Sequence, residues 1–150
     1  MAFFARNYPE YLEEAKTIGA RDPSKRIVFR SKSRWASADR HLGRLGALPI
    51  YLSANGAEGE VEYRAELCDV LLDPVPGSPK AERWLTDVLA STDYEKLWDE
   101  SVTTLYAIRG CQMLSQPFPI TRLIKLSNGE PISADFKYSY AIVRAIDDIK

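Results

Sequence analysis

Apolar and charged residues alternate strictly from Glu60 to Leu67, which is the pattern of a β-strand with one buried and one wet face. The phase changes after Leu67, because Cys68 and every second residue up to Leu72 now carry the apolar side. A β-bulge near Leu67–Cys68 produces such a change and bends the strand, as the wall of a barrel requires. The segment therefore predicts a curved β-sheet.

The other patterned segments do not alternate regularly between strand and helix. Strands are predicted over 26–30, 48–54, 103–114 and 138–146, and helices over 7–19, 36–45, 78–89 and 119–126, with further helical turns over 94–100. Asn7 is expected to cap the first helix, and Asn55-Gly56 is a strong turn signal. We therefore predict an α+β chain, built as a small curved antiparallel β-barrel with flanking helices.

Length and composition are those of one globular domain. The chain has 150 residues, of which 45 % are hydrophobic and 27 % charged, so one domain over 1–150 is expected, with residues 1–20 as an N-terminal helical extension. No apolar run is long enough to span a membrane, and the first residues lack the pattern of a secretory signal. Two cysteines do not make a disulfide framework, so a cytoplasmic location is expected.

The sequence contains no motif of a catalytic, metal or cofactor site. His41 is the single histidine, and no GxSxG, CxxC, HExxH or P-loop pattern occurs. Cys68 and Cys111 lie in strand-like segments, where cysteine usually behaves as a small buried hydrophobe. We therefore predict no catalytic residue, no metal and no cofactor, which favours a non-catalytic binding module.

The net charge of −1 hides two opposed blocks. Residues 21–44 contain eight basic and two acidic side chains, a net charge of +6. Residues 58–100 contain twelve acidic and four basic side chains, a net charge of −8. One positively charged face that binds a polyanion gives this pattern, and so do two solvated surfaces that differ in sign.

Aromatic and cationic residues occur together in the basic block. Trp35 lies beside Lys32 and Arg34 directly after a predicted strand, and Tyr51 and Ser53 share one face of the next strand. Aromatic rings stack on bases, while Lys and Arg neutralise phosphate. The same two aromatic residues also suit a hydrophobic core. Four arginines of the block are the predicted phosphate contacts: Arg26, Arg30, Arg40 and Arg44.

The passage Pro49–Asp73, with its turn and long bent strand, and the stretch Gln116–Ile120 (QPFPI) resemble the PUA-like superfamily, most nearly its EVE, YTH and ASCH branches and nearest EVE. The resemblance implies a curved barrel whose pocket receives a nucleobase. In the EVE branch it implies a modified base, of the methylated-cytosine type, in DNA or RNA. Carried over by position, the pocket residues are Ser31, Lys32, Ser33, Arg34, Trp35, Tyr51, Ser53, Asn55 and Tyr106.

The leading hypothesis is a reader domain that captures a flipped, modified base. Such a module often acts beside, or fused to, a nuclease or another effector, and no membrane is expected as a partner. The ASCH resemblance implies an alternative, a small amidohydrolase acting on an acylated nucleobase, with Lys32 as the amine and Glu62 or Glu66 as acid/base. A third alternative is a protein-interaction domain that binds a basic partner through residues 58–100.

Overall fold

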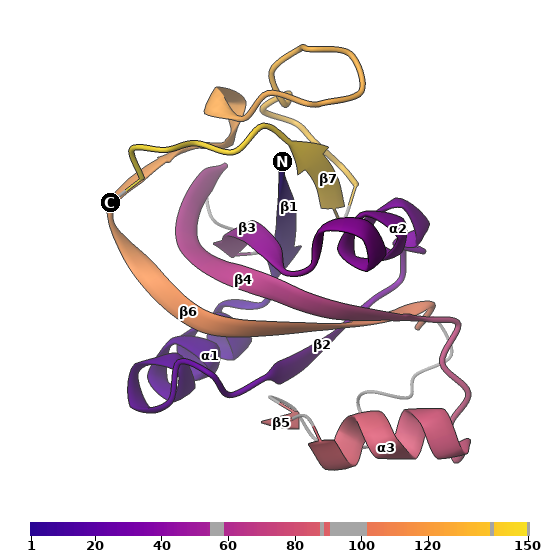
Figure 1. Cartoon of the computed structure of the whole chain (residues 1–150). Helices are drawn as coiled ribbons and strands as arrows, with labels where there is room; N and C mark the ends of the chain where they lie inside the picture. Colours follow the sequence, from indigo (N-terminus) through magenta and orange to yellow (C-terminus); the bar gives the residue numbers. More distant parts are fainter. Residues whose placement is uncertain (55–58, 88, 91–101, 139, 150) are drawn as a thin grey trace.

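The computed structural model describes residues 1–54, 59–87, 89–90, 102–138 and 140–149. Seven strands in this part of the chain form one curled sheet with the order β5-β2-β6-β4-β3-β1-β7 (Figure 1). The strands are β1 (Ala2–Asn7), β2 (Ile27–Ser31), β3 (Leu48–Ala54), β4 (Glu60–Leu72), β5 (Leu89–Ala90), β6 (Thr104–Pro119) and β7 (Tyr140–Val143). The helices are α1 (Pro9–Arg21), α2 (Ala36–Leu45), α3 (Pro79–Asp87) and the 3-10 turn η1 (Ile120–Arg122).

The long strands β4 and β6 form the wall of a half-closed barrel. Their antiparallel register shifts at three places, one of them between Leu67 and Asp69, which confirms the bulge predicted near Leu67–Cys68. Each shift leaves at least one residue outside the ladder and increases the local twist, so the two strands bend together around the interior (Figure 1). The change of alternation phase in the sequence therefore marks a position where the sheet bends.

The prediction of an α+β fold with a curved barrel and flanking helices is confirmed, but the sheet is mixed rather than antiparallel. β1 runs parallel to β3, with Phe3 opposite Ile50, and β2 runs parallel to β5. The remaining pairs, β1–β7, β2–β6, β3–β4 and β4–β6, are antiparallel. The parallel β1–β3 pair arises because β1, which the sequence analysis did not predict, enters the sheet between β3 and β7.

Residues 1–20 are part of the fold rather than an extension to it. The six residues of β1 are almost all buried, and Phe3 and Ala5 belong to the central core cluster together with Leu12 of α1. Helix α1 then lies against β6, where Gly19 approaches the backbone of Cys111 so closely that a Cβ would come within 2.8 Å of its nitrogen. The absence of a side chain at Gly19 therefore permits this packing.

Several predicted boundaries differ from the structure. The helix expected over 119–126 is only the short turn Ile120–Arg122, and the last strand covers four residues instead of nine. Helix α3 ends at Asp87, and the turn at Asn55-Gly56 and the helical turns over 94–100 lie outside the described residues. Within the described part of the chain, we find no helix with the length and apolar character needed to cross a membrane.

Candidate functional site

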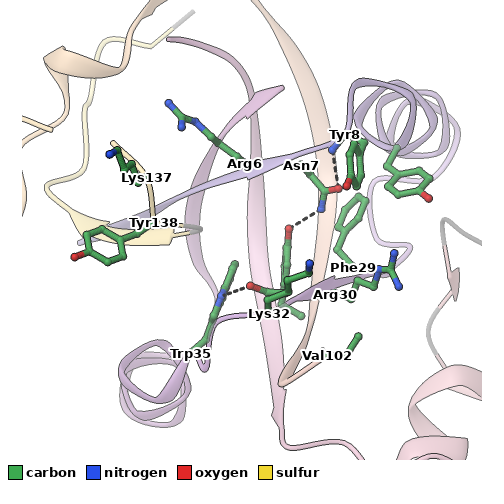
Figure 2. Close-up of a pocket in the computed structure, with 13 residues that line it drawn as sticks. Arg6, Asn7, Tyr8, Phe29, Arg30, Lys32, Trp35, Val102, Lys137 and Tyr138 are labelled. Atoms are coloured by element: carbon green, nitrogen blue, oxygen red, sulfur yellow. Dashed lines mark hydrogen bonds between the residues drawn. The ribbon is translucent and has the colours of Figure 1, made fainter. Parts of the chain in front are cut away.

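A cavity of about 370 Å³ opens where β1 and β2 end and α1 and α2 begin (Figure 2). Its volume lies within the range of about 300–1,000 Å³ that is usual for ligand sites. The segments before β6 and β7 complete the rim. The lining residues are Arg6, Asn7, Tyr8, Tyr11, Phe29, Arg30, Ser31, Lys32, Trp35, Val102, Tyr106, Lys137 and Tyr138.

Positive charge surrounds this cavity. Four of its lining residues are cationic, and none of those that the structure describes carries a carboxylate. The amino ends of α1 and α2 add positive partial charge on the same side. The cavity as a whole therefore favours an anionic ligand. The four cations are Arg6, Arg30, Lys32 and Lys137.

The polar floor of the cavity is a hydrogen-bonded pair, Asn7 and Tyr106. The Asn7 side chain accepts a hydrogen bond from the Tyr8 backbone N–H at 2.8 Å and donates one from Nδ2 to the Tyr106 hydroxyl at 2.9 Å (Figure 2). These two contacts fix which end of the Asn7 amide carries the nitrogen. The predicted capping role of Asn7 is wrong, since Tyr8 takes the N-cap position without a side-chain cap.

The Tyr106 hydroxyl keeps a proton that it can donate to a ligand. Burial raises the pKa of its phenol well above the ordinary value, so the group stays protonated. Its oxygen already accepts from Asn7, and within the described part of the chain it has no other hydrogen-bond partner. A ligand with a hydrogen-bond acceptor directed at the floor would therefore accept a hydrogen bond from the Tyr106 hydroxyl, a donor that no described residue pairs.

Trp35 is a wall of the cavity and not a stacking surface. Its ring lies nearly parallel to Tyr106, with 4.2 Å between centroids, and to Tyr140, with 4.6 Å. Two rings this close and parallel to one indole cannot share the same face, so both faces of Trp35 are covered. Only 1 % of the residue is exposed, and Nε1 donates to Ser31 Oγ at 3.1 Å. The expected role of Trp35 in stacking on a base is therefore wrong.

The structure brings five predicted site residues to this cavity. Ser31, Lys32, Trp35 and Tyr106 line it, as does Arg30 from the predicted phosphate contacts. The cluster forms because β2 ends at Ser31 beside β6, which carries Tyr106.

The neighbouring residues of the same segment lie elsewhere. Arg34 points away and forms an ion pair with Asp73, with 3.0 Å between Nε and Oδ2. Ser33 lines a second cavity on the other side of Trp35. Neither of these two side chains is among the residues that line the first cavity.

Tyr51 and Ser53 lie on the opposite face of β3 from the one that was expected. Ile50, Leu52 and Ala54 face the central core cluster that contains Trp35, so the residues between them face the other side of the sheet. The Tyr51 hydroxyl accepts a hydrogen bond from the Ile146 N–H at 2.8 Å, and Ser53 is fully buried. Their assignment to the pocket is wrong. Asn55 lies outside the described residues.

The other predicted phosphate contacts have different surroundings. Arg26 forms an ion pair with Asp69 at 3.1 Å and lies over the ring of Trp84, so its guanidinium is engaged within the fold. Arg40 and Arg44 are exposed on α2 and do not line the first cavity. Part of the basic block is therefore neutralised by the acidic block, which a count of charges along the chain does not show.

The residues of the hydrolase alternative do not converge. Lys32 lines the cavity, whereas Glu66 accepts a hydrogen bond from Arg109 Nε at 2.7 Å on another part of the sheet. Glu62 also lies outside the lining residues. In the part of the chain that the structure describes, no group of three or more His, Cys, Asp and Glu side chains is placed to hold a metal ion.

Eight lining residues were not predicted as site residues: Arg6, Asn7, Tyr8, Tyr11, Phe29, Val102, Lys137 and Tyr138. The first four were assigned to a segment before, or within, an amphipathic helix. Their connection with β2 depends on the insertion of β1 into the sheet, a long-range feature with no local signal. Lys137 and Tyr138 are highly exposed, and their place beside Trp35 and Tyr106 in the lining depends on the tertiary fold.

Comparisons with known proteins support the fold. No protein-family model matches the chain, and no curated protein matches it either. The curled mixed sheet with its helices is nevertheless an α+β fold of the PUA-like type, in the form seen in ASCH domains. The solved structure that carries this conclusion is the crystal structure of a mutant of ZmASCH from Zymomonas mobilis. The TM-score is 0.51 at 12 % identity, over 95 % of this chain and 88 % of that one.

Proposed function

We propose that this protein binds nucleic acid and takes one base, extruded from its neighbours, into the cavity above Asn7 and Tyr106. The observation that carries the proposal is the combination of a cationic rim with a polar, partly unsatisfied floor in a fold of the ASCH type. The cations of the rim attract phosphates whatever the base sequence, and the polar groups of the floor discriminate between bases that enter the cavity.

The cationic rim supplies the phosphate contacts. Lys32 and Lys137 are exposed at the mouth, and Arg6 and Arg30 are half-buried beside them. In Figure 2, Lys137 lies on one side of the cavity and Arg30 on the other, so a strand that crosses the mouth passes between positive charges. Because no described lining residue is acidic, nothing in this part of the site opposes a polyanion.

The exposed tyrosines take over the stacking role first assigned to Trp35. Tyr138 is 74 % exposed and Tyr8 is 49 % exposed, and the two lie on opposite sides of the cavity mouth (Figure 2). An exposed ring next to cations is the usual arrangement for holding an unstacked base. The floor then offers the Tyr106 O–H to an acceptor on the base edge, while Phe29 and Val102 provide an apolar wall.

A modified base of the methylated-cytosine type is the first ligand to test. A methyl group on the base would lie in a cavity that has apolar as well as polar walls, and burying it against Phe29 or Val102 contributes about 0.8 kcal/mol per carbon. Extrusion of a base from a duplex costs a few kcal/mol of stacking and pairing free energy, and the cost is smaller in a single strand, where the base is not paired. The proposal therefore predicts tighter binding to single strands than to duplexes.

The experiment is a panel of fluorescently labelled oligonucleotides that differ in one base. Single-stranded and duplex DNA and RNA, each with cytosine or 5-methylcytosine, are titrated at low and high salt. The expected result is salt-dependent binding, tighter for single strands and tighter again for the methylated base. Binding that a simple polyanion such as heparin matches in affinity and salt dependence would overturn base capture. No binding at low salt would overturn the proposal altogether.

A further inference from the structure

We infer that a second cavity, on the far side of Trp35, binds the adjoining nucleotide of the same strand. This inference rests on the proposed function and extends it from one base to a dinucleotide. The second cavity has a volume of about 940 Å³ and lies between α2 and the segments 125–127, 133–138 and 140–142. Basic, hydroxyl, aromatic and apolar side chains all contribute to its lining.

The two cavities share a wall. Lys137 and Tyr138 line both of them. On the other side of this boundary stands the ring stack around Trp35, in which Tyr106 faces the first cavity and Tyr140 lines the second. The partition between the two cavities therefore contains the stacked rings of Tyr106, Trp35 and Tyr140, and Lys137 and Tyr138 border both cavities beside it.

The lining of the second cavity fits a sugar, a phosphate and a base. His41, Lys125 and Lys137 are basic, and the one described carboxylate, Asp135, already accepts a hydrogen bond from the Ser133 hydroxyl. Hydroxyl groups line the α2 side, and Leu126 and Ile142 provide apolar surface. Cations, hydroxyls and an exposed aromatic ring together are the features that hold single-stranded nucleic acid.

Arg40 adds a cation at the rim of the second cavity. Its Nη2 donates to Ser37 Oγ at 3.0 Å, and Ser37 is a lining residue. Burial raises the pKa of the Tyr140 phenol, against smaller opposing effects of a hydrogen bond with Ser37 and of the positive charge of Arg40. Arg40, which the sequence analysis assigned to phosphate, therefore lies beside a lining residue of the second cavity and does not line the first.

The test uses competition against a labelled single-stranded oligonucleotide that contains 5-methylcytosine. The competitors are the 5′-monophosphate of 5-methyldeoxycytidine and the dinucleotides that extend it by one residue in either direction. We expect one of the two dinucleotides to compete at least about tenfold better than the mononucleotide. The variant Lys125→Glu removes this advantage and leaves competition by the mononucleotide unchanged.

Two further variants make the result specific. Arg40→Glu, on the other side of the cavity, is expected to reduce the dinucleotide advantage in the same way. Lys80→Glu reverses an equal charge on α3, away from both cavities, and is expected to change neither measurement. Equal losses in Lys80→Glu and Lys125→Glu would overturn the inference, because they would show a general effect of net charge.

The failure of this inference is distinguishable from the failure of the proposed function. If the mononucleotide competes but neither dinucleotide does so better, the second cavity is not a nucleotide site, and base capture by the first cavity stands. If the labelled oligonucleotide itself does not bind, the proposed function fails. Binding of a peptide or protein to the second cavity that Lys125→Glu abolishes, with no dinucleotide advantage, would also overturn the inference.

Discussion

The indole of Trp35 lies nearly parallel to the phenol of Tyr106, with 4.2 Å between the ring centroids and 18° between the ring planes. This contact joins the start of α2 to the start of β6, and the Tyr106 hydroxyl accepts a hydrogen bond from Asn7 of β1. Since β1 and β6 are not neighbours in the sheet, the Asn7–Tyr106 hydrogen bond closes the interior of the curled sheet. The floor of the cavity is therefore part of the core.

The first prediction separates a structural role of Trp35 from a binding role. Trp35→Ala removes a fully buried ring from a three-ring stack, and we expect the free energy of unfolding to fall by about 3–5 kcal/mol. Trp35→Phe keeps a ring between Tyr106 and Tyr140 and is expected to retain oligonucleotide affinity. Urea denaturation and anisotropy titration measure the two effects. Loss of binding in Trp35→Phe at unchanged stability would show that Trp35 contacts the base.

The second prediction uses two neighbouring cations of the same segment. Lys32 is exposed at the mouth of the first cavity, whereas Arg34 is engaged with Asp73 and does not line it. We expect Lys32→Ala to weaken oligonucleotide binding and to reduce the slope of log affinity against log salt by about one. Arg34→Ala is the matched control and is expected to leave the slope unchanged. The reverse order of effects would contradict the placement of the site.

The third prediction concerns Tyr138 as a stacking surface. The residue is 74 % exposed, so Tyr138→Ala is expected to change the free energy of unfolding by less than about 0.5 kcal/mol. If the ring stacks on a base, its removal costs about 1–3 kcal/mol of binding free energy. Tyr138→Phe keeps the ring and should bind like the parent protein. Unchanged affinity in Tyr138→Ala would exclude the ring from the site.

The fourth prediction tests the packing of α1 on β6 with a pair of glycines. A Cβ at Gly19 would come within 2.8 and 2.9 Å of backbone atoms of Cys111, while a Cβ at Gly43 in α2 would meet nothing within 4 Å. Gly19→Ala is expected to destabilise the fold by about 1–3 kcal/mol. Gly43→Ala should stabilise it by about 0.5–1 kcal/mol through helix propensity. Equal effects in thermal denaturation would argue against the close approach.

The fifth prediction follows from the burial of Tyr106, which raises the pKa of its phenol above the ordinary value of 10.0. Above about pH 10 the unfolded chain loses this proton while the folded protein keeps it. The stabilisation is therefore complete below that pH and is lost as the pH rises, by about 1.4 kcal/mol per pH unit from this group.

The variant Tyr106→Phe isolates that contribution, because the other tyrosines titrate equally in both proteins. Its free energy of unfolding should fall less steeply above pH 10 than that of the parent, as measured by urea denaturation at several alkaline pH values. Identical slopes would mean that the hydroxyl is accessible to solvent in the folded state.

Much of the fold follows from local patterns. The alternation of β4 and its change of phase after Leu67 identify the curved wall, and the boundaries of α2 and β3 agree with the sequence prediction. These elements can be predicted because the apolar residues of a half-buried strand and of an amphipathic helix each recur with a characteristic spacing in the sequence. The strand β1 leaves none, since nearly all of its short apolar run is buried.

The site is harder to predict, because it depends on which face of an element points inward. The alternation along β3 shows that Tyr51 and Ser53 share one face, but the choice of face depends on the sheet as a whole. Likewise Lys32 and Arg34 are two residues apart in the sequence. The ion pair of Arg34 with Asp73, the residue directly after β4, depends on the tertiary fold. Of the four arginines predicted to contact phosphate, the structure places Arg30 at the first cavity and the other three elsewhere.

The side-chain amide of Asn7 provides the most direct test of base capture, because it lies on the floor of the cavity and its nitrogen is bonded to Tyr106. In an NMR titration with a single-stranded oligonucleotide containing 5-methylcytosine, we expect this amide and the backbone amides of Tyr8 and Lys32 to shift. If the largest shifts instead appear around Arg26, Asp69 and Trp84, with the Asn7 amide unmoved, the nucleic acid binds elsewhere and the account is contradicted.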